Sequence, residues 1–205
     1  MSFCLIILAA GNSYRFKSKL PKPYLKIGGK SLIEINIEKA SKIKKIRKIL
    51  LIYNKKDIKH LKKLKIKNVK IIKGGKSRQE STFYGLKHII KDKKIKGVLI
   101  HDAARPNFST RLIYSILSNM KKNNAVIPKI KIDDAVKQVF DNNIDEYIVG
   151  KERENLFLTQ TPQCFRLNEI YNLHKKNKKK YQDDDISLYS DLNKVKFIEG
   201  EKENF

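Results

Sequence analysis

The sequence predicts an α/β fold, in which short buried strands alternate with helices around an open sheet. The first observation is a series of apolar runs, beginning at residues 3–8, that are too short for helices and are typical of strands. The second is that segments with helical apolar spacing, several of them preceded by capping residues, lie between these runs. The third is that small or charged residues follow several runs directly, at the strand ends where open α/β sheets bind ligands.

The bulk composition indicates one domain of a cytoplasmic protein. The chain has 205 residues, of which 40% are hydrophobic, which is enough for a core. We find neither a membrane span of about 18 apolar residues nor the pattern of a signal peptide. The two cysteines, Cys4 and Cys164, are far apart in sequence and predict free thiols. The net charge of +25 is spread along the chain as lysine, so we expect no nucleic-acid or membrane partner.

Six further elements are predicted in the first half of the chain, after the strand at 3–8. Ser31 and Glu34 fit a capping box that begins a helix, and Ser77 and Glu80 fit a second one that begins a helix ending near Ile90. Strands are expected at 47–53, 68–72 and 97–101, with a short helix at 57–64. The strand at 97–101 is apolar throughout, which favours a central place in the sheet.

The second half of the chain predicts a change of pattern. A helix capped by Ser109 and a strand at 125–128 are followed by two short β-like runs joined by an Asn-rich turn at 141–143. We expect this hairpin to form an arm, about residues 133–155, outside the main sheet. Further predicted elements are a strand at 156–160, a helix at 168–180 and a strand at 195–198. The acidic run at 183–187 fits a metal site or, equally, a charged helix start.

The loop after the first strand predicts an anion site. Ala9, Ala10 and Gly11 carry almost no side chain, so the backbone can approach a ligand closely. Arg15 and Lys22 follow and supply two cations, a combination that suits a polyphosphate. The loop lacks the G-x-x-x-x-G-K-[ST] pattern of a P-loop and the G-x-G-x-x-G pattern of a dinucleotide fold. The alternative interpretation is an ordinary strand-to-helix turn with basic surface residues.

Two other strand ends carry candidate site residues. The segment G-G-K-S-R-Q-E-S at 74–81 reads either as a simple strand–turn–helix joint or as a second wall of a nucleotide pocket. The segment H-D-A-A-R-P at 101–106 places Asp102 where a magnesium ion could take a carboxylate oxygen together with substrate phosphates. Ala103 and Ala104 leave room beside Asp102, and Arg105 can hold a phosphate. A buried Asp–Arg ion pair is the alternative for this segment.

These motifs resemble those of a known enzyme family. The first loop, L-A-A-G-N-S-Y-R followed by P-K, resembles the opening signature of sugar-nucleotide pyrophosphorylases and related nucleotidyltransferases. With G-G-K-S-R-Q-E-S, H-D-A-A-R-P and T-P-Q-C-F in this order, the chain resembles the 2-C-methyl-D-erythritol 4-phosphate cytidylyltransferases over almost its whole length. The resemblance implies a doubly wound, mostly parallel, Rossmann-like nucleotidyltransferase sheet with a projecting β-hairpin arm. It also implies CTP and methylerythritol phosphate as substrates, Mg²⁺ as cofactor, and a homodimer formed through the arm.

The resemblance also implies a role for each site residue. Residues that match catalytic groups are Arg15, Lys22 and Arg153, of which Arg153 would serve the neighbouring subunit. The residues that match the pocket around the cytidine are Ala10, Gly75, Ser81 and Ala103. Ala9 and Gly11 of the first loop are also expected to bind the nucleotide. Asp102 matches the metal ligand, and the groups that match the acceptor site are Arg105, Arg153 and Asp134. Ala135 stands where the family has a threonine, which removes a hydroxyl expected near the acceptor phosphate.

Three alternatives remain beside this family. Ribitol-5-phosphate cytidylyltransferases share fold and donor, and a pyrophosphorylase that uses another nucleotide is more distant. A basic nucleic-acid-binding module, from a different class, would account for the net charge of +25 but for none of the four motifs. The family continues past Asn204 with a lysine in an N-x-K-[IV]-T motif, so the resemblance predicts that this chain is truncated at its C-terminal end. Some members are fused to 2-C-methyl-D-erythritol 2,4-cyclodiphosphate synthase, and the resemblance leaves open whether such a domain follows here.

Overall fold

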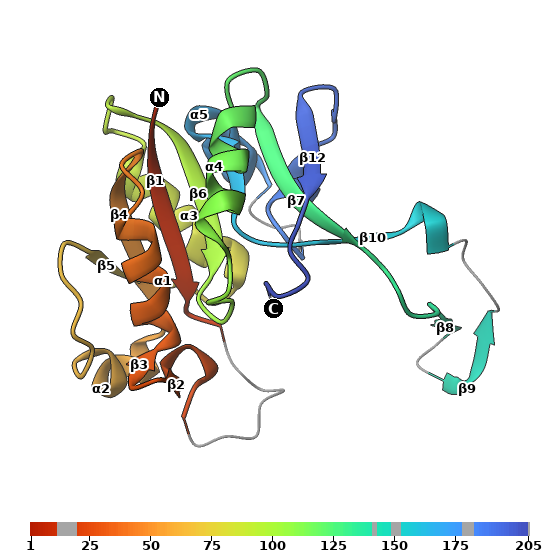
Figure 1. Cartoon of the computed structure of the whole chain (residues 1–205), viewed down its shortest axis with the longest axis horizontal. Coiled ribbons are helices and arrows are strands. Elements are labelled where there is room, and N and C mark those ends of the chain that lie inside the picture. Colours follow the sequence, from red (N-terminus) through yellow and green to blue (C-terminus); the bar gives the residue numbers. More distant parts are fainter. Residues whose placement is uncertain (12–19, 141–142, 149–152, 178–182, 205) are drawn as a thin grey trace.

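A computed structural model of the chain describes residues 1–11, 20–140, 143–148, 153–177 and 183–204, with side chains described outside 138–148. These residues form an eight-stranded sheet with helices on both faces (Figure 1), which confirms the predicted α/β class. The strands of this sheet are β1 Ser2–Ala9, β4 Ile46–Tyr53, β5 Lys70–Lys73, β6 Ile95–Asp102, β7 Ala125–Lys131, β10 Phe157–Thr159, β11 Gln163–Arg166 and β12 Val195–Glu199.

The parallel part of the sheet has the strand order β5, β4, β1, β6. Next to β6 lies β11, which is antiparallel to both β6 and β7. The far side of β7 pairs in parallel with β12, and β10 pairs antiparallel with the end of β7 at residues 129–131. The sheet is therefore mostly parallel, and β6 occupies a central place, as its unbroken apolar run predicts.

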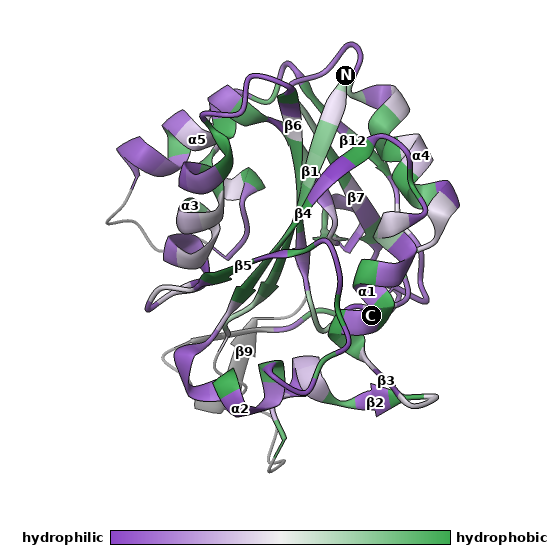
Figure 2. Ribbon diagram, turned by 90° about the vertical axis from the view of Figure 1, so that its left-hand side faces the viewer, coloured by the Kyte–Doolittle hydropathy of each residue, from purple (hydrophilic) through white to green (hydrophobic). Residues whose placement is uncertain are grey.

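The two faces of the sheet have separate cores because side chains alternate along each strand. In β1 the odd-numbered residues 3–9 face one core and the even-numbered residues 4–8 face the other. Figure 2 shows apolar central strands between two helical layers. The first layer contains α1 Leu32–Ser41 and α4 Thr110–Asn119. The second contains α3 Arg78–Ile89 and α5 Leu167–Lys176. Helices on both faces make the fold doubly wound.

Short-range signals place three of the helix starts correctly. Ser31 and Glu34 form the complete capping box, since each side chain accepts a hydrogen bond from the other residue's backbone N–H. Ser77 and Ser109 accept from the backbone N–H three residues later, at 3.0 Å in both cases. The helix predicted at 57–64 is shorter, a 3-10 turn at Lys55–Asp57 followed by α2 Ile58–Leu61. Asn54 starts it early by accepting from Lys56 N–H.

Strand β11 is absent from the sequence-based prediction. Its four residues follow Thr161 and Pro162, and Cys164 and Phe165 are fully buried within it. An antiparallel strand this short gives no periodic signal, and its place depends on pairing with β6 and β7, which are remote in sequence. The helix that follows ends at Lys176 rather than at 180, and the lysines at 178–180 lie outside the described residues.

Two hairpins lie outside the main sheet. Strands β8 Gln138–Phe140 and β9 Asn143–Ile148 pair with each other and project away from the body of the protein, as predicted for the arm (Figure 1). A small hairpin, β2 Lys26–Ile27 and β3 Lys30–Ser31, turns at Gly28 and Gly29, which both have positive φ. Three 3-10 turns complete the fold, η1 Lys22–Tyr24, η3 Arg153–Asn155 and η4 Ile186–Leu188. In the described part of the chain, no helix is long and apolar enough to cross a lipid bilayer.

Candidate active site

The carboxyl ends of the parallel strands bring three of the sequence motifs together. Asn54 Nδ2, after β4, donates to the carbonyl of Ala10, after β1, at 3.2 Å. Gly74 N–H, after β5, donates to the carbonyl of Tyr53 at 2.8 Å. Ala103 N–H, after β6, donates to the carbonyl of Leu8 in β1 at 3.0 Å. The loops that the sequence assigns to a nucleotide therefore share one edge of the sheet, where α/β folds bind ligands.

The glycine pair after β5 is packed closely against the first loop. A β-carbon at Gly74 would lie 2.4 Å from that of Ala10 and 2.9 Å from the hydroxyl of Ser81, so glycine is required here. Ser81 Oγ accepts from Gly75 N–H at 3.0 Å and donates to the carbonyl of Ser77 at 2.8 Å. Of the residues predicted to surround the cytidine, Ala10, Gly75 and Ser81 are thus neighbours. The hydroxyl of Ser81 supports the shape of the loop.

The other predicted pocket residues differ in exposure. Ala9 and Ala103 are fully buried, and their side chains belong to the core on the α1 and α4 face. They can therefore offer only backbone atoms to a ligand. Gly11 is exposed, and a β-carbon there would meet no atom of the described residues within 4 Å. The described part of the chain therefore shows no steric need for glycine at this position.

His101 fixes the backbone around Asp102. Its Nε2 lies 2.8 Å from the carbonyl of Arg105, and its Nδ1 lies 3.0 Å from Thr161 Oγ1. Thr161 Oγ1 also accepts from the backbone N–H of Asp102 at 3.2 Å. These contacts suit a neutral imidazole that donates from Nε2 and accepts at Nδ1. Complete burial lowers the pKa of His101 to about 4, so the ring is neutral at pH 7.

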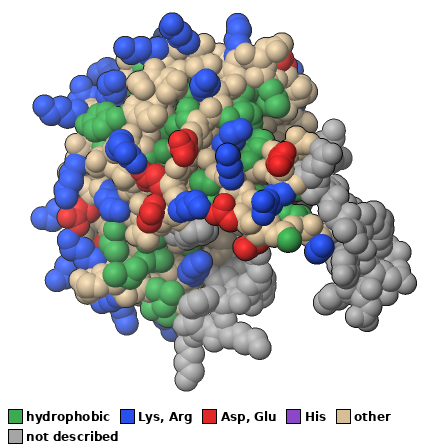
Figure 3. Space-filling view, turned by 45° about the vertical axis from the view of Figure 1, so that its right-hand side comes forward, with side chains coloured by type: hydrophobic (Ala, Val, Ile, Leu, Met, Phe, Trp, Pro, Cys, Tyr) green, Lys and Arg blue, Asp and Glu red, His purple; other side chains and the backbone are tan. Residues whose placement is uncertain are grey.

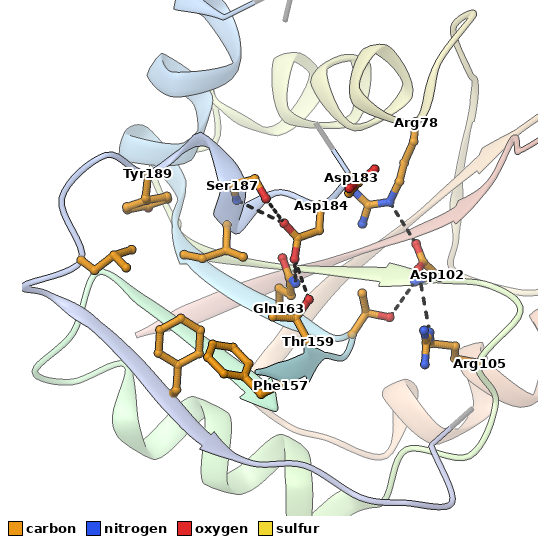
Figure 4. A pocket seen from close by; sticks show the side chains of 14 residues that line it. Arg78, Asp102, Arg105, Phe157, Thr159, Gln163, Asp183, Asp184, Ser187 and Tyr189 are labelled. Atoms are coloured by element: carbon orange, nitrogen blue, oxygen red, sulfur yellow. Dashed lines mark hydrogen bonds and ion pairs between the residues drawn. The ribbon is translucent and has the colours of Figure 1, made fainter. Parts of the chain in front are cut away.

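A cavity of about 510 Å³ opens beside Asp102 (Figure 4). One side is polar, and the other is apolar. The polar side chains that line it are Arg78, Asp102, Arg105, Thr159, Thr161, Gln163, Asp183, Asp184 and Ser187. The apolar or aromatic ones are Phe157, Ile186, Tyr189, Leu192 and Phe197. A pocket with an apolar wall and a few converging charged groups is typical of small-molecule sites.

Asp102 lies between two guanidinium groups in this cavity (Figure 4). Its Oδ1 is 3.3 Å from Arg78 Nε, and its Oδ2 is 3.9 Å from Arg105 Nε. Arg105 Nη1 donates to the carbonyl of Asn204 at 3.0 Å. The ion pair that the sequence offered as an alternative is therefore present, although Asp102 is about one-third exposed and faces the cavity. The metal-binding role of Asp102 stays a prediction.

Arg78 is the site residue that the sequence prediction missed. Its Nη1 pairs with Asp185 Oδ2 at 2.7 Å, and Asp185 Oδ1 pairs with His174 Nε2 at 2.9 Å. Burial alone would raise the pKa of Asp185, but Arg78 and His174 hold it below its usual value. Burial opposes the charge on Arg78, but Asp185 and Asp102 raise the pKa of its guanidinium. An arginine in the G-G-x-x-R spacing, in a chain that mostly uses lysine, was the available signal.

The acidic run at 183–187 begins a helical turn, as one of its two interpretations predicted. Asp184 Oδ1 accepts from the backbone N–H of Ser187 at 3.1 Å at the start of η4. Its Oδ2 accepts from Thr159 Oγ1 and from Gln163 Nε2, each at 2.8 Å. Among the residues that the structure describes, no three or more His, Cys, Asp or Glu side chains form a metal-binding cluster. The run is therefore mainly structural, with Asp183 exposed at the edge of the cavity.

The donor set nevertheless fits Mg²⁺ when a polyphosphate binds. Mg²⁺ prefers oxygen ligands, keeps several waters, and is often held by one or two carboxylates together with substrate phosphates. Asp102 offers one partly exposed carboxylate at the end of β6, and Asp183 lines the same cavity. A site that needs phosphate oxygens to be complete does not require a cluster of protein ligands.

Arg15 is outside the described residues, so the structure does not test its predicted role. Lys22 is exposed in η1. Arg153 and Asp134 are exposed at the base of the arm, where Arg153 Nη1 donates to the carbonyl of Asp133 at 2.6 Å. Neither of them lines the cavity beside Asp102. The structure therefore groups the predicted nucleotide residues and separates from them two of the three predicted acceptor residues.

The surface charge shows no single basic patch on the face in Figure 3. Lysine and arginine side chains are spread over this face, and aspartate and glutamate side chains lie among them. Several exposed lysines pair with carboxylates, such as Lys30 with Glu38 and Lys202 with Asp133, both at 2.5 Å. Exposed pairs of this kind contribute little to stability.

The doubly wound sheet, the small-residue loops at the carboxyl ends of its strands and the Asp102 cavity are the features of a nucleotidyltransferase. The chain matches the family model for 2-C-methyl-D-erythritol 4-phosphate cytidylyltransferase (IspD) over residues 3–205. It belongs to that family, and the ribitol-phosphate alternative is not favoured.

Relatives and solved structures agree with this assignment. The chain is 45% identical to the bifunctional enzyme IspD/IspF of Pelagibacter ubique over 205 residues, which cover 100% of this chain and 54% of that protein. It is 36% identical to a cytidylyltransferase of Clostridium botulinum, covering 98% of this chain and 89% of that protein. The crystal structure of 4-diphosphocytidyl-2C-methyl-D-erythritol synthase from Anaerococcus prevotii matches with a TM-score of 0.83 at 32% identity, covering 100% and 89% of the two chains.

The bifunctional relatives are about twice as long. The structure of IspDF from Campylobacter jejuni matches with a TM-score of 0.82 at 30% identity, covering 100% of this chain and 51% of that chain. The chain therefore spans about half the length of the bifunctional proteins that it matches.

Proposed function

We propose that this chain transfers CMP from CTP to 2-C-methyl-D-erythritol 4-phosphate and releases pyrophosphate. The observation that carries the proposal is the H-D-A-A-R-P segment, which ends the central strand β6 with Asp102 and Arg105 lining a cavity. Family membership supports the same reaction. The Ala10, Gly75 and Ser81 neighbourhood offers a compact backbone wall for the cytidine at the same edge of the sheet.

The reaction joins two phosphates. An oxygen of the acceptor phosphate attacks the α-phosphorus of CTP, the bond from that phosphorus to the β-phosphate oxygen breaks, and pyrophosphate leaves with the electron pair. A phosphate dianion is already a nucleophile, so no general base is required. Positioning and charge stabilisation therefore supply most of the acceleration. Negative charge on the α-phosphate oxygens would be stabilised by Arg15 and Lys22.

Asp102 and Arg105 have complementary tasks at the end of β6. Asp102 would hold a divalent cation, which when bound supplies positive charge to the phosphates of CTP. Arg105 presents a planar cation beside the cavity and suits the phosphate of the acceptor. His101 stays neutral and holds the loop, so it does not act as an acid or base at pH 7.

The quaternary arrangement and the compartment belong to the same proposal. Arg153 and Asp134 lie at the base of a projecting arm and line no part of this chain's cavity, which favours a homodimer in which the arm reaches a neighbouring site. Both cysteines are free and buried, which is compatible with a reducing cytoplasm.

Pyrophosphate release tests the proposed function. The chain is incubated with Mg²⁺, one of CTP, UTP, ATP or GTP, and either methylerythritol phosphate or ribitol 5-phosphate. Release only with CTP and methylerythritol phosphate is expected. Asp92→Asn serves as a control, because Asp92 pairs with Lys48 away from the cavity and its loss should leave the rate unchanged. Release with ribitol 5-phosphate and not with methylerythritol phosphate would show that the proposed acceptor is wrong. Release with another nucleotide would show that the proposed donor is wrong.

A further inference from the structure

The guanidinium group of Arg78 contacts two carboxylates, Asp102 and Asp185, that belong to different sequence motifs. Arg78 is the first residue of α3, behind the cap at Ser77. Its Nη1 pairs with Asp185, which precedes η4. Its Nε pairs with Asp102 at the end of β6 (Figure 4). A single planar group therefore links α3, the acidic run and the proposed metal ligand.

The contact with Asp185 is fixed. The side chain of Asp185 is only 1% exposed and also pairs with His174 Nε2 at 2.9 Å. His174 belongs to α5 and is equally buried. A buried carboxylate is strongly destabilising when it loses its partner, so Asp185 holds the Arg78 guanidinium in place. This removes the rotational freedom that an arginine side chain has at a surface.

The contact between Arg78 and Asp102 is more exposed to solvent than the contact with Asp185. The orientation of the Asp102 carboxylate therefore depends on the position of the Arg78 guanidinium. About one-third of the Asp102 side chain is exposed. Within the described part of the chain, its carboxylate receives one side-chain hydrogen bond, from Arg78 Nε to Oδ1 at 3.3 Å. Arg105 Nε is 3.9 Å from Oδ2, which is an ion-pair distance but too long for a hydrogen bond. Oδ2 thus remains available, whereas Oδ1 is held.

We propose that Arg78 is a positioning residue for the cytidylyl transfer: anchored on Asp185 and His174, it fixes the orientation of the Asp102 carboxylate. This inference rests on the proposed function. Partners that orient a metal-binding carboxylate typically contribute about 10–100-fold to metal affinity or activity. Lysine cannot replace Arg78, because a single ammonium lacks the planar fork that contacts two carboxylates at once.

Three variants test this role, with one matched control. Arg78→Lys keeps the positive charge but loses the planar guanidinium that contacts two carboxylates. Asp185→Asn keeps the shape of the side chain but loses the negative charge that holds Arg78. The double variant measures whether the two residues act as a unit. Arg166→Lys is the control, since Arg166 is also a partly buried arginine but bonds backbone carbonyls such as that of Met120, at the opposite end of the strands.

The first measurement is Mn²⁺ binding, followed by electron paramagnetic resonance in the presence of α,β-methylene-CTP and without acceptor. Arg78→Lys should weaken Mn²⁺ binding about 10-fold or more. Asp185→Asn should weaken it in the same direction, and the double variant should match Arg78→Lys, because the anchor matters only through Arg78. In steady-state assays Arg78→Lys should lower kcat more than it changes the KM for the acceptor. The control should leave both measurements unchanged.

Several results would overturn the proposal. Wild-type Mn²⁺ affinity in folded Arg78→Lys is one, and additive losses in the double variant are another. If circular dichroism shows that Arg78→Lys is unfolded, folded Asp185→Asn decides the question, and unchanged Mn²⁺ binding in that variant contradicts the role. A wild-type chain that binds Mn²⁺ with the nucleotide but releases no pyrophosphate would refute the proposed function alone.

Discussion

Acid should destabilise this protein through His101 before most carboxylates are protonated. The ring is completely buried, with its nitrogens facing the carbonyl of Arg105, the amide oxygen of Asn36 and the hydroxyl of Thr161. The rings of Phe108 and His101 pack edge to face, with their centroids 4.9 Å apart. A charged imidazole would lose its hydration without gaining a direct carboxylate partner in these contacts. Burial therefore lowers the pKa of His101 from 6.5 to about 4.

The size of the effect follows from proton linkage. Because the pKa of His101 is lower in the folded state, its contribution to stability is present above pH 6.5 and is lost as the pH falls toward 4. The pKa of His101 is 6.5 in the unfolded chain and about 4 in the folded protein. At about 1.36 kcal/mol for each pH unit between these two pKa values, the complete loss of stability is about 3 kcal/mol. At pH 5 the unfolded chain is mostly protonated at this position, and the loss is already about 2 kcal/mol.

Urea unfolding at pH 7.5 and pH 5 measures this loss against His101→Gln. The glutamine amide can still donate to the carbonyl of Arg105 but does not titrate. The variant should lose about 1 kcal/mol at pH 7.5 from the missing contact to Thr161. Between the two pH values, its free energy of unfolding should fall by about 2 kcal/mol less than that of the wild type. Equal falls in both proteins would refute the assigned state of His101.

Four further outcomes are expected. Asp102→Asn should lower kcat about 100-fold or more and weaken Mg²⁺-dependent CTP binding measured by calorimetry, and an unchanged Mg²⁺ dependence would favour the ion pair as its whole role. Lys22→Ala should lower kcat about 100-fold with a smaller change in the KM for CTP, and a change in KM alone would contradict a transition-state role. Gly74→Ala should lower the free energy of unfolding by about 1–3 kcal/mol, because its β-carbon would lie 2.4 Å from that of Ala10, and an unchanged urea midpoint would contradict the close packing. Mixed dimers of Arg153→Ala and Asp102→Asn chains should recover activity if Arg153 acts on a neighbouring site, whereas demonstrably mixed dimers without recovery would place that site within one subunit.

The parts of the fold that the sequence predicts depend on short-range signals. The strand at the N-terminus and the caps at Ser31, Ser77 and Ser109 are set by residues at most a few positions apart, and the structure confirms them. Strand β11 was missed because its place depends on pairing with β6 and β7. Local pattern reasoning cannot identify a four-residue antiparallel strand whose partners are remote.

The same distinction holds for the candidate site. Asp102 is the last residue of β6 and Gly75 lies two residues after β5, so their place at the edge of the sheet could be predicted from motif order. The network of Arg78, Asp185 and His174 could not, because it joins residues up to 107 positions apart in sequence. Sequence spacing alone does not show which of several charged residues meet in three dimensions.

The most direct test of the proposed function is the identity of the product. The wild-type chain is supplied with CTP, Mg²⁺ and methylerythritol phosphate labelled with ¹⁸O in its phosphate, and the products are analysed by ³¹P NMR and mass spectrometry. Attack by the acceptor phosphate on the α-phosphorus predicts a cytidine diphosphate conjugate that retains all of the label, with unlabelled pyrophosphate. Labelled pyrophosphate, or no conjugate under conditions where CTP binds, would contradict the proposed reaction.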